Sequence, residues 1–179
     1  MSLAELERIL PPPESKFEVA SSPDEWKFVE STIGTVLPTD YKQFIDAYGS
    51  GSIDRFVSIF NPFSKNEHVN LVDAIRTKLD ALRELQNEFE SERKYFLFPD
   101  AGGLLPFGGT DNGDVFFWKT SGEPDQWPVV VNESRAPEFE EFPTDMTSFL
   151  AGILTRTISS TIFPRAFPSQ TARFVPRTP

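Results

Sequence analysis

Residues 108–118 read GGTDNGDVFFW, where glycines and polar side chains give way abruptly to apolar and aromatic ones. Asn-Gly is the strongest two-residue signal for a hairpin, because both central residues of a type I′ turn take positive φ. Asn112–Gly113 lies between two β-like runs, Leu104–Phe107 and Asp114–Lys119. The stretch therefore predicts a tight turn between two antiparallel strands.

Two other interpretations of the same stretch compete with the turn. Gly108 and Gly113 have the glycine spacing of a phosphate-binding loop, but Asp114 follows where that loop requires lysine. A carboxylate there would repel a phosphate group. An EF-hand frame fails at its first or its sixth position, depending on where it begins. A non-EF calcium site built from Asp111 and Asp114 stays open as a minor alternative.

Outward from this hairpin, the chain has helical patterns first, then β-like segments with one helix among them, and then a last helix. Apolar residues recur at helical spacing in residues 3–10, 22–33, 37–48, 69–90 and 145–157. In the longest of these stretches the apolar stripe is formed by Val72, Ile75, Leu79, Leu82 and Phe89. The β-like segments are residues 53–60, 95–98, 104–107, 114–119 and 127–131.

These patterns predict an α+β fold in which helices pack on one side of a central sheet of about five strands. Short loops between the strands favour a mostly antiparallel sheet, with a mixed sheet as the alternative. Residues 114–119 are apolar on both faces, which predicts a central strand that is covered on both sides.

Composition divides the chain into three parts. Residues 1–21 are expected to form a short helix and a proline-rich connector, and residues 22–158 the α+β domain. Residues 159–179 have four prolines, no periodicity and only basic charges, so they are expected to form an extended or disordered tail.

The charge distribution is strongly asymmetric. The chain has a net charge of −10, and no acidic residue follows Asp145. Residues 1–145 carry −14, because the four arginines of the remainder contribute +4 to the total of −10. The negative charge of residues 1–145 repels nucleic-acid phosphates and attracts a basic protein surface.

Residue types that are missing or rare exclude several kinds of chemistry. The chain has no cysteine and a single histidine, His68, so disulfides, thiolate nucleophiles and His/Cys zinc sites are not expected. We predict no catalytic residue, metal or cofactor. A carboxylate-based hydrolase using acidic residues near Asp100 and Asp114 is the enzymatic alternative. No apolar run is long enough to span a bilayer, and the N-terminus does not resemble a secretory signal, so a cytoplasmic location is expected.

Three ordered motifs carry a family resemblance. They are LPTDYKQFIDAYGSGSID (residues 37–54), LLPFGGTDNGDVFFW (residues 104–118) and FPTDMTSFLAGIL (residues 142–154). Together they resemble the SUKH superfamily, which includes fungal regulators of cell-wall synthesis and bacterial immunity proteins. The resemblance implies an α+β fold and a protein-binding role, in bacteria often the neutralisation of a cognate toxin such as a nuclease. It implies no catalytic signature.

The hypothesis that follows is an acidic immunity protein that binds and blocks a basic toxin domain. Its docking surface is predicted to consist of loop carboxylates around an aromatic anchor, namely Asp100, Asp111, Asp114, Asp125, Glu133 and Trp127. The alternative is a regulatory or scaffold module related to the cell-wall regulators, in which the basic tail acts as a docking arm.

Overall fold

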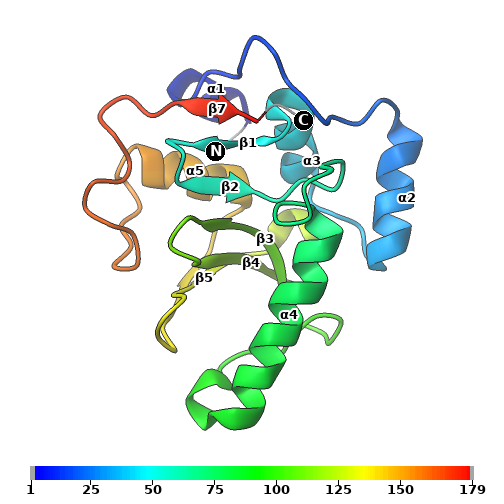
Figure 1. Ribbon diagram of the computed structural model, residues 1–179, viewed down its shortest axis with the longest axis vertical. Coiled ribbons are helices and arrows are strands. Elements are labelled where there is room, and N and C mark those ends of the chain that lie inside the picture. Colours follow the sequence, from blue (N-terminus) through cyan, green and yellow to red (C-terminus); the bar gives the residue numbers. More distant parts are fainter. Residues whose placement is uncertain (1–2, 178–179) are drawn as a thin grey trace.

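Three helices come first along residues 3–177, the part of the chain that the computed structural model describes, and strands with two further helices among them follow (Figure 1). Residues 1–2 of the predicted N-terminal segment and residues 178–179 of the predicted tail lie outside the described part. The helices are α1 (Leu3–Ile9), α2 (Pro23–Ile33), α3 (Thr39–Tyr48), α4 (Leu71–Glu88) and α5 (Met146–Leu154), with short 3-10 turns η1 (Glu90–Glu92) and η2 (Pro124–Gln126). The strands are β1 (Gly51–Ile53), β2 (Val57–Ile59), β3 (Leu104–Thr110), β4 (Val115–Lys119), β5 (Val129–Asn132), β6 (Phe139–Phe142) and β7 (Phe174–Pro176).

The described strands form one antiparallel sheet in the order β6-β5-β4-β3-β2-β1-β7. The predicted α+β class is confirmed, but the expectation of about five strands is wrong because the sheet has seven. The stretch 53–60 splits into two strands at Asp54 and Arg55, whose φ angles are 51° and 56°. Two further strands, β6 and β7, were not predicted. The predicted strand 95–98 makes only an isolated parallel bridge, between Leu97 and Leu104.

The predicted hairpin joins β3 to β4, but its turn differs from the expected type. The Gly113 amide donates to the Thr110 carbonyl at 2.9 Å, and the Thr110 amide donates to the Asp114 carbonyl at 2.9 Å. Only Gly113 of the Asn-Gly pair has a positive φ, of 96°. The loop is therefore a three-residue turn that ends in a left-handed glycine, and the expected type I′ turn is wrong.

Asp114 links this turn to the β5–β6 hairpin by hydrogen bonds. Its carboxylate accepts hydrogen bonds from the Thr110 hydroxyl at 2.6 Å and from the Ser134 amide at 3.1 Å. We expect Asp114→Ala to lower the free energy of unfolding by about 1–3 kcal/mol, because it removes two part-buried hydrogen bonds to a charged acceptor. Urea denaturation of the two proteins measures this difference. Asp111→Ala, at the exposed tip of the same turn, is the control and should have little effect.

Both faces of the sheet are covered. On one face, Phe107, Phe116 and Trp118 pack with buried residues of α1, α2, α3 and α5. On the other face, β-sheet residues such as Phe117 pack with Leu79 and Leu82 of α4. The prediction that residues 114–119 are covered on both sides is confirmed. The expectation that helices lie on one side only is wrong, because α4 packs against β3 from the opposite face.

The segments outside the central domain complete its core. Leu6 and Leu10 are fully buried, and the Tyr48 hydroxyl donates to the Leu10 carbonyl. In the tail, β7 pairs with β1, and the Phe163 ring lies 5.8 Å from the ring of Phe116. The described part of the tail is thus extended and packed, and not disordered. No helix among residues 3–177 is long and apolar enough to cross a membrane.

Candidate functional site

Two of the predicted partner-binding residues are buried. Trp127 is 4% exposed, and its indole N–H donates to the Gly122 carbonyl at 3.1 Å. Asp114 is 3% exposed and holds the β3–β4 turn. Neither side chain is available to a partner in the folded chain. The prediction treated Asp114 as a carboxylate beside a loop and Trp127 as an aromatic anchor, although each begins a segment that the sequence marks as β-like.

The other four predicted residues lie at two opposite ends of the central strands, Asp111 and Glu133 at one end and Asp100 and Asp125 at the other. Asp125 accepts from the Thr39 amide at 2.6 Å and from the Thr39 hydroxyl at 3.1 Å, and so holds the first turn of α3. Asp111 is exposed at the tip of the β3–β4 hairpin, and Glu133 is half-buried after β5. Asp100 is exposed in the loop before β3. The six residues therefore do not form one surface.

The same arrangement argues against the hydrolase alternative. Asp100 precedes β3 and Asp114 follows it, so the seven residues of that strand separate them. At about 3.3 Å per residue the strand spans about 20 Å. Paired carboxylates that cleave glycosides lie within about 10 Å of each other. Within residues 3–177 no group of three or more His, Cys, Asp or Glu side chains could hold a metal ion, so the calcium alternative at Asp111 and Asp114 gains no support.

A different surface combines exposed apolar groups with free carboxylates. We call residues 84–100, at the end of α4 and in the segment that follows, the α4 projection. Figure 1 shows this end of α4 extending past the neighbouring strands. Among the described residues, five large apolar side chains are markedly exposed, and three belong to the projection: Leu85 (41%), Phe89 (52%) and Phe96 (70%).

The exposure of these residues follows from the length of α4. Leu79 and Leu82 face the sheet and are buried. Leu85 lies in the last turn of α4 and Phe89 is its C-cap, at the end of the helix that extends past the strands in Figure 1. The sequence pattern assigned Phe89 to the apolar stripe of this helix. Periodicity identifies the apolar face of a helix, but it does not show where the sheet that covers this face ends.

Glutamates accompany these apolar groups. Glu84, Glu88 and Glu90 are exposed, and within residues 3–177 their carboxylates make no hydrogen bond or ion pair. This differs from the preceding turn of α4, where Asp80 pairs with Arg83 at 2.8 Å. The end of the helix thus offers negative charge and apolar surface together.

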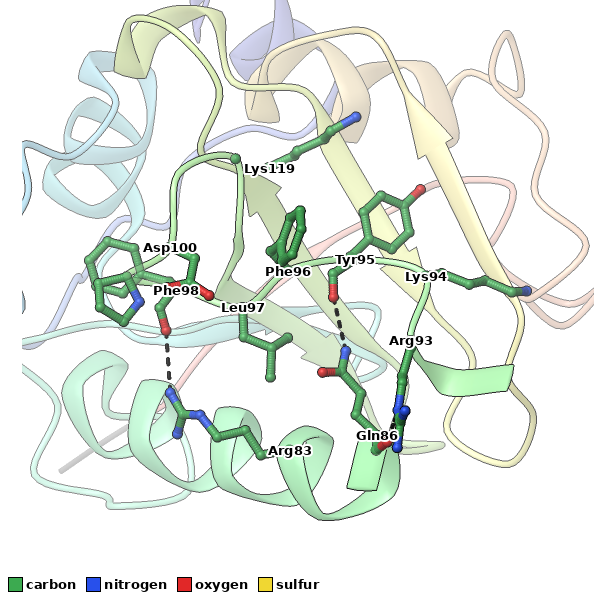
Figure 2. Close-up of a pocket in the computed structure, with 12 residues that line it drawn as sticks. Arg83, Gln86, Arg93, Lys94, Tyr95, Phe96, Leu97, Phe98, Asp100 and Lys119 are labelled. Carbon is green, nitrogen blue, oxygen red and sulfur yellow. Dashed lines mark hydrogen bonds between the residues drawn. The ribbon is translucent and has the colours of Figure 1, made fainter. Parts of the chain in front are cut away.

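A pocket of about 550 Å³ lies between α4 and the second half of the projection (Figure 2). Four basic side chains line it, but Figure 2 shows them pointing in different directions. All four have partners elsewhere: Arg83 binds Asp80 and the Phe98 carbonyl, Arg93 binds the Gln86 and Asn87 carbonyls, Lys94 binds the Pro137 carbonyl, and Lys119 pairs with Glu141. They do not converge on a common anion site.

The segment that carries Phe96 is held on both sides. The Gln86 side chain donates to the Tyr95 carbonyl at 3.0 Å, and the Tyr95 hydroxyl donates to Glu141 at 3.1 Å. Burial first, and then the Glu141 carboxylate, raise the pKa of Tyr95, so its hydroxyl stays protonated at neutral pH. These contacts fix the backbone before Phe96, and the Phe96 carbonyl accepts from the Leu104 amide at 2.9 Å, so the exposed ring extends from a fixed backbone beside the pocket.

Comparison with known proteins adds one match. Residues 23–150, more than half of the chain, match the sequence model of a protein family described as "SUKH_6: SMI1-KNR4 cell-wall". No curated protein and no solved structure matches the chain significantly. The matched region begins at α2 and ends within α5, so it contains the α4 projection but neither α1 nor β7.

Proposed function

Because the chain belongs to the SMI1-KNR4 family of the SUKH superfamily, we propose that it is a non-enzymatic binding domain that occludes a basic protein partner. This family includes toxin immunity proteins. The partner that fits the charge of the chain best is the basic domain of a toxin, for example a nuclease, whose substrate-binding surface must itself be positive.

The observation that carries the proposal is the α4 projection. Exposed apolar side chains that are surrounded by polar groups are typical of protein-binding surfaces. Here Phe89 and Phe96 supply aromatic groups of the kind that dominate binding energy at interfaces. Glu84, Glu88 and Glu90 supply carboxylates that are not yet paired, so they can pair with lysine or arginine of the partner.

Binding of this kind has two separable parts. Long-range attraction between the chain, of net charge −10, and a basic partner increases the association rate and weakens with salt. Once the complex has formed, the contacts of Phe89 and Phe96, which become buried on binding, set the dissociation rate. Inhibition would result from steric blockade of the partner's active surface, with no chemical step in this chain.

A matched pair of variants tests the role of the projection. We expect Phe89→Ser to weaken binding to a basic toxin domain that the unaltered chain binds by about tenfold or more, as loss of an interface aromatic does. Phe28→Ser is the control, because Phe28 is also exposed (73%) but lies on α2. It should leave the affinity within about twofold. Surface plasmon resonance at nanomolar concentrations measures both. Equal loss in the two variants, or none in either, would count against the projection.

The regulatory alternative remains a proposal of its own, and the words "cell-wall" in the family description favour it. The version in which the tail acts as a docking arm is less well supported. The described tail residues pack on the domain, and the Asp54 carboxylate accepts from the Ser169 and Arg173 amides at 2.9 Å each. A regulator would bind its partner without neutralising any toxin, so a toxicity rescue assay separates the two functions.

A further inference from the structure

A second apolar feature lies away from the α4 projection. A groove of about 450 Å³ runs between α2, the loop after β2 and the first turn of α4. Its walls are mainly apolar and are formed by Val29, Pro62, Phe63 and Val72, and its polar lining residues are Ser22, Asp24, Glu25 and Thr32. Phe28 borders the same groove and is 73% exposed, the largest exposure among the large apolar side chains of the described residues.

The groove is a concave feature, and the exposed Phe28 ring is a convex feature (a knob) beside it on the same surface. An exposed phenylalanine ring does not fill the groove beside it, although the groove is large enough to hold an aromatic side chain. A two-fold symmetric dimer requires that a surface be complementary to itself, so that the knob of each copy enters the groove of the other. We propose that this face binds a second copy of the chain, with Phe28 of each protomer seated in the groove of its partner.

Charges at the edge of the groove are also self-complementary. Asp24 lines the groove one turn before Phe28, and it pairs at 2.8 Å with Lys27, the residue next to Phe28; both side chains are highly exposed. Such an exposed pair contributes little within one chain. In a symmetric dimer the same two residues can pair across the interface, once from each side. α2 stands at the side of the molecule, away from the end of α4 (Figure 1), so the dimer would leave the α4 projection free.

The net charge predicts how this dimer responds to salt. Each copy carries −10, so two copies repel each other at long range, and salt screens that repulsion. Dimerisation should therefore be weak and become stronger as salt is added. Binding of a basic partner through the projection should show the opposite dependence, which makes the two interactions distinguishable.

Sedimentation velocity of the full chain, from about 1 to about 500 µM, tests the proposal. We expect a monomer at the lower end, a dimer at the upper end, and a dimer fraction that rises when salt is raised from about 0.05 to about 0.5 M. Phe28→Asp, and separately Thr32→Arg at the groove edge, should keep the chain monomeric throughout. Phe89→Asp is the matched control and should dimerise like the unaltered chain.

Two results would overturn the proposal. One is a monomer over the whole concentration range at both salt levels, which would leave the groove to a partner other than this chain. The other is a dimer that persists in both the Phe28→Asp and Thr32→Arg variants. Circular dichroism of each variant shows that it is folded, which is expected because Phe28 and Thr32 are exposed. Neither result bears on toxin binding, which is measured with Phe89→Ser.

Discussion

A chain that ends at residue 158 is expected to melt about 10–20 °C below the full chain. The reason is that the tail contributes to the core. Phe163 and Phe167 pack against Phe116 and Phe56, at ring separations of 5.8 and 4.9 Å, and β7 covers the edge of β1. Burying an aromatic side chain stabilises a fold by about 1.5–3 kcal/mol. A loss of about 5 kcal/mol from a domain of this size lowers Tm by about 10–20 °C.

Thermal melting followed by circular dichroism measures this effect. The control is Arg165→Ser, which removes a tail charge from an exposed position and should leave Tm unchanged. A disordered docking arm would give the opposite pattern, since its deletion would not alter Tm at all. Equal melting temperatures for the full and shortened chains would therefore refute the packed tail.

The packed tail also changes how a docking-arm hypothesis can be tested. Deleting residues 159–179 does not separate the two mechanisms, because it removes the arm and destabilises the domain at the same time. Point variants of exposed tail arginines, such as Arg165 and Arg173, leave the buried phenylalanines in place. Only these variants can separate recognition by the tail from its structural role.

The fold was predictable where local chemistry is strong. Asn112–Gly113 between two β-like runs identified the central hairpin, and the apolar pattern of residues 115–118 identified a strand with two covered faces. The strands that were missed lack such signals. β6 reads FEEF and lies at the edge of the sheet, and β7 contains a proline in a stretch without periodicity. Their pairing partners are set by tertiary contacts that no local pattern records.

The candidate site was harder to predict than the fold. Acidic residues in loops were assigned to a docking surface, but the structure uses Asp114 and Asp125 to hold a turn and a helix end. Whether a loop carboxylate is free depends on which amides approach it from distant segments. The exposure of Phe89 depends in the same way on where the sheet under α4 ends. Sequence periodicity contains neither piece of information.

Reversing the charge of the α4 projection should slow association with a basic partner by about 10–100-fold. The variant Glu84→Lys/Glu88→Lys/Glu90→Lys changes the net charge from −10 to −4, since each of the three reversals adds +2. Lysine near the C-terminal end of a helix interacts favourably with the helix dipole, so the fold should be preserved. The dissociation rate should change much less than the association rate, because steering acts before the contacts form.

A second triple variant separates local charge from total charge. Glu14→Lys/Glu67→Lys/Glu123→Lys makes the same change in net charge at exposed positions outside the projection. If the partner docks on the projection, this control should slow association by about threefold or less, because charges more than a Debye length from the interface are screened. The gap between the two variants should close at about 0.5 M salt. Stopped-flow or surface plasmon resonance kinetics give both rates. Equal slowing by the two variants would mean that the overall charge steers the partner and that the projection is not where it binds.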